Sequence, residues 1–157
     1  MASPSRGTKV AVIVVVVLAG VMFAMYFAVH RQVVHGKTME GRTALLDIGR
    51  GAVAAYDKDR TLCPTATPAP AKLDTCVSAA QGGTGYQSMH TEWNGFACLG
   101  FEVTGPQHYQ YTYERTDDGF VARANGCLPE MGTLEIRGRV TSGHLELGPV
   151  VLVVPPR

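Results

Sequence analysis

A long, uncharged apolar run near the N-terminus is the feature that most constrains this chain. It extends from Val10 to Val29 and contains no charged residue. About 20 helical residues are needed to cross the roughly 30 Å hydrocarbon core of a bilayer. Backbone groups in lipid must be satisfied within the segment, which favours a helix despite the β-branched valines. The sequence therefore predicts a transmembrane helix over residues 10–29.

The competing interpretation of this run is a cleaved secretory signal peptide. Ala19 followed by Gly20 loosely fits a small-residue cleavage site. However, the apolar run continues well past that point and exceeds the roughly 7–15 residues of a signal-peptide core. A retained membrane anchor is therefore the favoured interpretation.

The orientation of the predicted anchor follows mainly from the cysteines. Arg6 and Lys9 precede the run, but basic residues also follow it, so the positive-inside rule alone is weak. All four cysteines lie beyond the run, and disulfides persist in oxidising compartments. We therefore expect a cytoplasmic N-terminus over residues 1–9 and one exported globular domain over residues 30–157.

Composition excludes one class of partner and limits the size of the fold. The 157 residues carry a formal net charge of +1, and there is no basic stripe with interleaved aromatics, so we expect no nucleic-acid binding. Beyond the apolar run, about 100 residues or fewer remain to build a core, which is enough for one small domain. Domains of this size often need disulfides for stability.

The exported domain is predicted to begin with an amphipathic helix over residues 30–59. Apolar residues recur there mostly every three or four positions, the spacing of one helix face. They are Met39, Leu45, Ile48, Ala52 and Tyr56. Residues 60–95 are rich in proline and glycine and are predicted to be a loop region.

An antiparallel sheet is predicted over residues 96–157, because the apolar period there changes to two. The expected strands cover residues 107–114, 120–124, 133–140 and 145–154, and residues 96–103 are a further strand candidate. The preceding helix is the one long amphipathic element able to cover a face of this sheet. The predicted fold class is therefore α+β: a long N-terminal helix, with a transmembrane half and an amphipathic half, packed against an antiparallel β-meander of about four strands.

No residue pattern predicts catalysis or metal binding. The sequence has no G-x-S-x-G, P-loop or dinucleotide-binding motif, and its histidines lack metal-ligand spacing. His90 with Glu92, and His144 with Glu146, would share strand faces, but such pairs are usually solvated surface groups. We therefore expect no enzyme activity, no catalytic or metal site, no cofactor and no small-molecule substrate.

A tyrosine stripe is the candidate binding face. Tyr109, Tyr111 and Tyr113 alternate with polar residues on the clearest predicted strand. They either line a binding surface or pack as a half-buried sheet face with their hydroxyls at the rim, and the second arrangement is the commoner one.

The four cysteines, Cys63, Cys76, Cys98 and Cys127, are the residues most committed to a chemical role. Four reduced thiols or a zinc site are disfavoured, because no C-x-x-C pair or Cys/His metal spacing is present. Two disulfides are therefore expected. Four cysteines allow three pairings, and spacing alone does not choose among them.

Several segments together give a family resemblance. They are Leu62-Cys63-Pro64, Gly85-Tyr86-Gln87-Ser88, Glu92-Trp93, Phe96-Ala97-Cys98-Leu99-Gly100-Phe101, Pro106-Gln107-His108-Tyr109-Gln110-Tyr111 and Gly119-Phe120-Val121-Ala122-Arg123-Ala124. In this order, and after a membrane helix that continues into an amphipathic helix, they resemble a subgroup of bacterial type IV pilins and pseudopilins. The resemblance implies a single-pass inner-membrane protein with a periplasmic domain, displayed at the cell surface if assembled. It also implies the lipid bilayer, other pilin-like subunits or assembly-platform proteins as partners.

Two departures from that family bear on function. Gly7 stands where a prepilin peptidase would cut, but the Glu that follows this site in pilins is absent from Thr8 to Val12. Residues 127–132 also replace an Asp-rich turn whose carboxylates suit a hard cation. The resemblance further implies the pairings Cys63–Cys98 and Cys76–Cys127, because relatives with two cysteines keep the first pair.

The resemblance implies a structural or accessory protein of a type IV pilus or of a type II secretion-like apparatus. The alternative is an anchored periplasmic binding module with a pilin-like domain that does not polymerise. The missing Glu favours this alternative over a major filament subunit.

Overall fold

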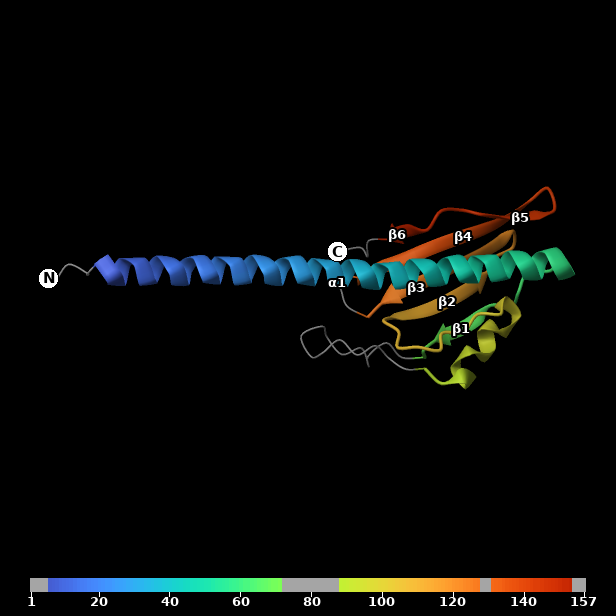
Figure 1. Cartoon of the computed structure of the whole chain (residues 1–157). Helices are drawn as coiled ribbons and strands as arrows, with labels where there is room; N and C mark the ends of the chain where they lie inside the picture. Colours follow the sequence, from blue (N-terminus) through green and yellow to red (C-terminus); the bar gives the residue numbers. More distant parts are fainter. Residues whose placement is uncertain (1–5, 72–87, 128–130, 154–157) are drawn as a thin grey trace. The chain divides into compact units, whose positions relative to one another are not determined.

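The described part of the structure contains one long helix, a short helix and one antiparallel sheet (Figure 1). It is a computed structural model that describes residues 6–71, 88–127 and 131–153. The described elements are the α-helix α1 (Arg6–Asp59), the 3-10 helix η2 (His90–Leu99) and the strands β1 (Ala66–Ala69), β2 (Tyr109–Arg115), β3 (Gly119–Gly126), β4 (Thr133–Thr141), β5 (His144–Leu147) and β6 (Val151–Val153). The chain forms two compact units, Met1–Gly36 and Lys37–Arg157.

The structure contradicts the expectation that the first half of the helix is a transmembrane span. Among the described residues, no helix combines the length and the apolarity that crossing a bilayer requires.

The sheet has six strands rather than the expected four or so, and all its pairs are antiparallel. The strand order is β1-β2-β3-β4-β5, and β6 also pairs with β4. The expected strand over residues 145–154 is two strands, β5 and β6, that pair with different parts of β4. The interruption falls at Gly148 and Pro149, where proline has no N–H to continue a ladder.

Two further elements lie where the sequence predicts others. The predicted loop region contains β1, which pairs only with β2 and is therefore an edge strand that tolerates Pro68. The strand candidate over residues 96–103 is wrong, because helix η2 occupies its first half and no strand forms in the rest. The buried residues of η2 are Trp93, Phe96 and Leu99, and this period of three matches the three residues per turn of a 3-10 helix.

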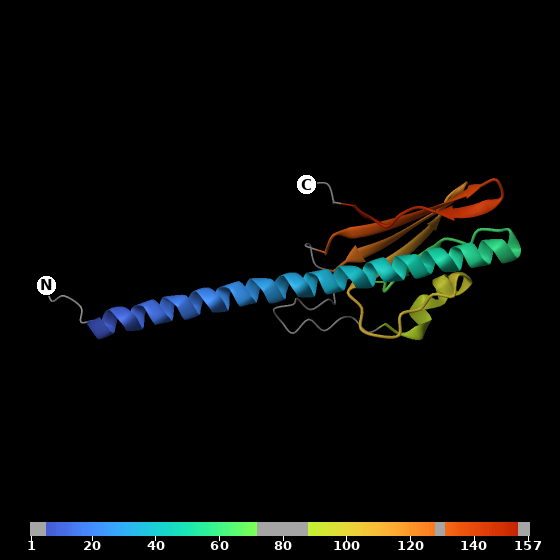
Figure 2. The same ribbon diagram turned by 45° about the horizontal axis from the view of Figure 1, so that its top comes forward.

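Within the unit Lys37–Arg157, the helix covers the inner face of the sheet (Figures 1 and 2). Leu45 and Ile48 are fully buried and Ala52 nearly so, as the helical period predicts. Met39 is exposed and Tyr56 half-buried, so the contact face is shorter than the predicted stripe. The inner face of the sheet is formed by Tyr109, Tyr111, Tyr113, Phe120, Ala122, Ala124, Leu134 and Ile136, all buried.

Two glycines of α1 allow this close packing. A Cβ added at Gly41 would lie 2.9 Å from the Cε2 and Cζ atoms of Tyr109. A Cβ added at Gly51 would collide with the backbone carbonyl of Leu99, at the end of η2. The helix therefore contacts both the sheet and η2 through positions that carry no side chain.

Polar contacts hold both ends of this helical segment to the sheet. Near its start, Glu40 accepts a 2.9 Å hydrogen bond from the backbone N–H of His108, and its other oxygen lies 3.0 Å from Nδ1 of the same histidine. Just past its end, Arg60 donates from Nη1 to the carbonyl of Gly143 at 2.8 Å. These contacts fix the position of the helix along the strands.

Gly51→Ala tests the helix packing. Alanine favours helix by about 1 kcal/mol over glycine, but overpacking against a backbone carbonyl costs about 1–3 kcal/mol. We therefore expect a net loss of stability and a Tm lower by several degrees, measured by circular dichroism of the full chain. Gly20→Ala is the control, because nothing lies within 4 Å of the Cβ position at Gly20. An unchanged Tm in Gly51→Ala would contradict this account of the packing.

Candidate functional site

The tyrosine stripe is not an exposed binding face. Tyr109, Tyr111 and Tyr113 point from β2 toward the helix and are at most 1% exposed. Burial raises the pKa of all three phenols, that of Tyr113 to about 12, so they are neutral at physiological pH. They are buried because β2 lies second in the sheet, where one face is fully covered. Their role is therefore packing, and the candidate binding face is corrected.

The aromatic core extends from this stripe to the short helix. Trp93 of η2 makes an edge contact with Phe101, with ring centroids 5.4 Å apart, and its indole N–H donates to the hydroxyl of Ser88 at 2.8 Å. Phe101 in turn lies edge-on to Tyr111 at 5.6 Å. Through this cluster, η2 packs against the β1 edge of the sheet.

One predicted disulfide is confirmed. Cys63, which follows α1, is bonded to Cys98 of η2, and their Cα atoms are 5.8 Å apart. The bridge ties η2 to the segment between α1 and β1. Cys127 is also disulfide-bonded. Cys76 lies outside the described residues, so the pairing Cys76–Cys127 stays a prediction.

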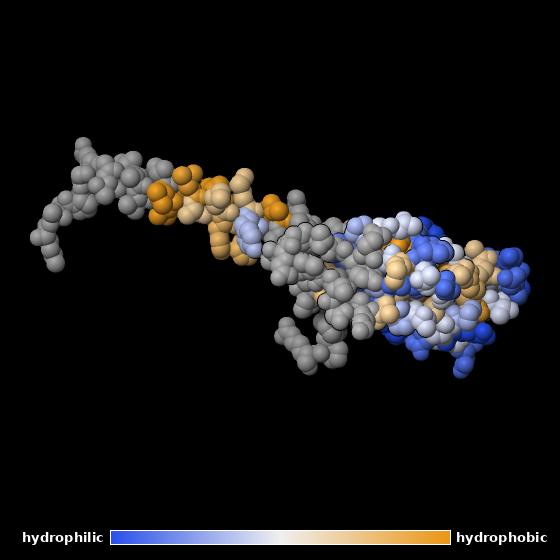
Figure 3. Space-filling model, turned by 90° about the horizontal axis from the view of Figure 1, so that it is seen from below, coloured by the Kyte–Doolittle hydropathy of each residue, from blue (hydrophilic) through white to orange (hydrophobic). Residues whose placement is uncertain are grey.

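Part of the predicted anchor is itself an exposed apolar surface. Every residue from 15 to 29 is exposed, and its large apolar side chains are 50–70% exposed. Figure 3 shows this part of α1 as mostly apolar, with a small hydrophilic interruption. The side chains of residues 10–14 lie outside the description. Soluble proteins rarely leave so long an apolar stretch uncovered, so it is a candidate interaction surface.

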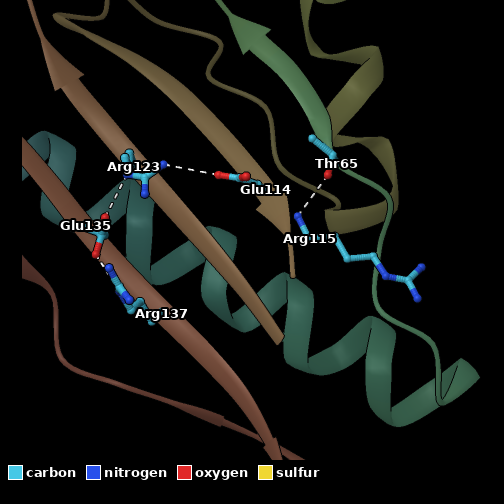
Figure 4. Close-up of polar contacts among 6 residues, drawn as sticks. All are labelled: Thr65, Glu114, Arg115, Arg123, Glu135 and Arg137. Carbon is cyan, nitrogen blue, oxygen red and sulfur yellow. Dashed lines mark hydrogen bonds and ion pairs between the residues drawn. The ribbon is translucent and has the colours of Figure 1, made fainter. Parts of the chain in front are cut away.

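A ladder of charged side chains crosses the outer face of the sheet (Figure 4). Glu135 of β4 accepts from Nε of Arg123 at 2.8 Å and from Nε of Arg137 at 2.7 Å. Arg123 also reaches Glu114 of β2 at 3.5 Å. Beside the ladder, Arg139 donates from Nε to Asp118 at 2.7 Å.

Glu135 is the buried centre of this ladder, with a side chain only 7% exposed. Burial acts to raise the pKa of its carboxyl group, but the hydrogen bonds and charges of Arg137 and Arg123 outweigh that effect. The pKa of Glu135 therefore lies below its usual value. The carboxylate is ionised at neutral pH and fixes the direction of both arginines.

The histidine pairs that the sequence brings together are not the ones that form. His90 lies 2.8 Å from Glu102 instead of pairing with Glu92, and His108 pairs with Glu40 of the helix. No hydrogen bond joins His144 and Glu146, whose Cα partners in the sheet are Thr141 and Arg139. Within the described ranges, no group of His, Cys, Asp and Glu side chains has the arrangement of a metal site.

The outer-face arginines were missed in the sequence. Arg123, Arg137 and Arg139 stand on alternating positions of two strands, which the period-two pattern does predict. What the pattern leaves undetermined is the register that places Arg123 opposite Glu135 and Arg139 opposite Gly119.

Removing the confirmed disulfide tests its structural role. Cys63→Ala combined with Cys98→Ala should lower the free energy of unfolding by about 2–4 kcal/mol, because the reduced chain gains loop entropy on unfolding. Urea titration of the full chain measures the change. Peptide mapping of the wild type without reductant provides the control, and should return a Cys63–Cys98 peptide. An unchanged urea midpoint, or a Cys63–Cys76 peptide, would contradict the assignment.

Glu135→Gln tests the charged ladder. A folded-state pKa below the usual value means that the carboxylate stabilises the fold above pH of about 4.3, and that this stabilisation is lost as the pH falls through the folded pKa. We expect a loss of about 1–3 kcal/mol at pH 7, shrinking below about pH 4. Urea midpoints at both pH values measure it.

Glu114→Gln is the matched control for this experiment, since Glu114 is 61% exposed and meets Arg123 only at 3.5 Å. It should change stability by less than about 0.5 kcal/mol. Equal effects of the two substitutions at pH 7 would show that burial of Glu135 does not matter.

Comparison with known proteins assigns no family. No family model, no curated protein and no solved structure matches this chain. The likeness to type IV pilins therefore stays a prediction from its residues.

Proposed function

We propose that this chain is a structural or accessory subunit of a type IV pilus or of a type II secretion-like apparatus, and that it works by assembly with other subunits rather than by catalysis. The observation that carries the proposal is the exposed apolar surface of residues 15–29. The residue-level likeness to pilins and pseudopilins supports the same class of function.

The distribution of apolar side chains around the helix favours several partners over one. Val15, Val16, Val17 and Leu18 are consecutive, and consecutive residues point in different directions around a helix. All four are 58–64% exposed. A helix that is apolar on all sides is stable in water only when it is surrounded. Equivalent helices of several neighbouring subunits would surround it, as in a helical bundle at the centre of an assembly.

Aromatic residues add a more specific contact surface to this stretch. Phe23 and Phe27 are one helical turn apart, and their ring centroids are 4.8 Å apart. Both rings are more than half exposed. Large aromatic side chains of this kind dominate the energetics of interfaces. We therefore place the centre of the subunit contact near this pair.

The disulfide supports an oxidising compartment for the unit Lys37–Arg157. Cytosolic thiols are usually kept reduced, whereas Cys63 and Cys98 are bonded. We place this unit in the bacterial periplasm, or at the cell surface when the chain is assembled. The second candidate function, an exported binding module that does not polymerise, is favoured by the absence of Glu after Gly7.

Phe23→Glu in the full chain tests assembly. A carboxylate in a helix bundle loses hydration without gaining a partner, so association should weaken by at least about tenfold. Sedimentation velocity over a range of protein concentrations, in buffer without detergent, measures this. Met39→Glu is the matched control, because Met39 is similarly exposed at 59% but lies outside the apolar stretch.

Two results would overturn the proposal. One is a full chain that stays monomeric at every concentration. The other is a full chain that binds lipid vesicles and shows no cross-link between copies through Phe23→Cys. That second result would mean that lipid, rather than neighbouring subunits, covers the stretch.

A further inference from the structure

A hollow on the outer face of the sheet lies between two arginines. It has a volume of about 280 Å³ and is lined by Thr116, Asp118, Val121, Arg137, Gly138 and Arg139, among others. We call it the arginine hollow. We propose that it binds the carboxylate side chains of an acidic, extended segment of a partner protein.

Strand register sets what stands opposite the two arginines. On β3, Gly119 stands opposite Arg139 and Val121 stands opposite Arg137. Gly119 lets β3 and β4 approach closely at this point, because a Cβ there would collide with the carbonyl of Gly138.

The two arginines have donors to spare. Among the described residues, Arg137 donates only through Nε to Glu135, and Arg139 only through Nε to Asp118. Figure 4 shows the first of these contacts. Each guanidinium keeps its two Nη groups for another acceptor. The side chains are 70% and 77% exposed, so these groups are accessible.

The chemistry and spacing fit carboxylates on an extended chain. Guanidinium groups with free N–H pairs bind carboxylates with two parallel hydrogen bonds. Arg137 and Arg139 are two positions apart on β4, which is about 7 Å along a strand. Acidic side chains on alternate residues of an extended partner segment have the same repeat. Each arginine can therefore meet one carboxylate.

Acidic side chains also lie around the arginine hollow. Two arginines and one acidic residue, Asp118, line the arginine hollow. Glu135 is already shared between Arg123 and Arg137. Glu146 stands opposite Arg139 on β5, is exposed, and would repel an approaching carboxylate. It therefore offers a test in the opposite direction to removal of an arginine.

This inference is independent of the proposed assembly, because it rests on the sheet and not on residues 15–29. The probe is a short peptide of alternating glutamate and threonine, blocked at both ends and labelled for fluorescence anisotropy. Arg137→Gln and Arg139→Gln in the full chain should each weaken its binding about tenfold, as expected for loss of a charged hydrogen-bond pair. Arg50→Gln is the matched control, since Arg50 is 73% exposed on α1 and makes the same change of charge.

Two further variants separate recognition from folding and from net charge. Arg139→Lys keeps the charge but loses the planar pair of donors, so it should still weaken binding several-fold. Glu146→Gln should strengthen binding, because it removes a repelling carboxylate without removing any contact in the described structure. Thermal unfolding confirms that each variant is folded.

The proposal is overturned if Arg50→Gln weakens binding as much as the two hollow variants, because the effect would then be general charge attraction. It is equally overturned if Glu146→Gln leaves binding unchanged, if a glutamine–threonine peptide binds as well, or if inorganic phosphate at equal concentration displaces the peptide. Binding of the acidic peptide that depends on Arg137 and Arg139 and resists phosphate supports it.

Discussion

The contact between α1 and the aromatic inner face of the sheet is the interaction on which the rest of the unit Lys37–Arg157 depends. Leu45 and Ile48 supply the apolar face of the helix, and the tyrosines of β2 supply most of the opposing surface. Gly41 and Gly51 let the backbone come close enough for these side chains to interlock. Contacts of Glu40 and Arg60 then set the position of the helix along the strands.

The helix covers one face of the sheet, and the other face is open to water and carries polar and charged side chains. The alternation of a strand sends Tyr111 inward and Thr112 outward, so the same residues that build the core also define the outer surface. The outer face collects arginines and acids because it meets water. Glu135 is the exception, since its neighbours Arg123 and Arg137 cover it and compensate its burial.

The two surfaces proposed to bind partners differ in the forces available to them. Residues 15–29 offer apolar area without direction, which suits the packing of several similar helices. The arginine hollow offers directed donors at a fixed spacing, which suits recognition of one kind of chemical group. An accessory subunit that assembles through the first surface would keep the second free for a different partner.

Local sequence patterns predicted several elements correctly. The tyrosine alternation predicted β2, the period of two over residues 120–124 predicted β3, and the helical period predicted burial of Leu45 and Ile48. These signals are local because a strand or helix repeats within a few residues. The same logic misread residues 96–103, where a period of three was mistaken for one of two.

Tertiary structure alone decided how the tyrosines and the outer-face arginines are placed. The sequence pattern of alternating tyrosines is the same for a buried and for an exposed sheet face. Only the position of β2 beneath α1 shows that this face is buried. The register in which β3 and β4 pair sets Arg137 opposite Val121 and Arg139 opposite Gly119. Register and covering depend on contacts between residues far apart in the chain. The free energies of these long-range contacts arise only in the folded domain, so no short segment of the sequence predicts them.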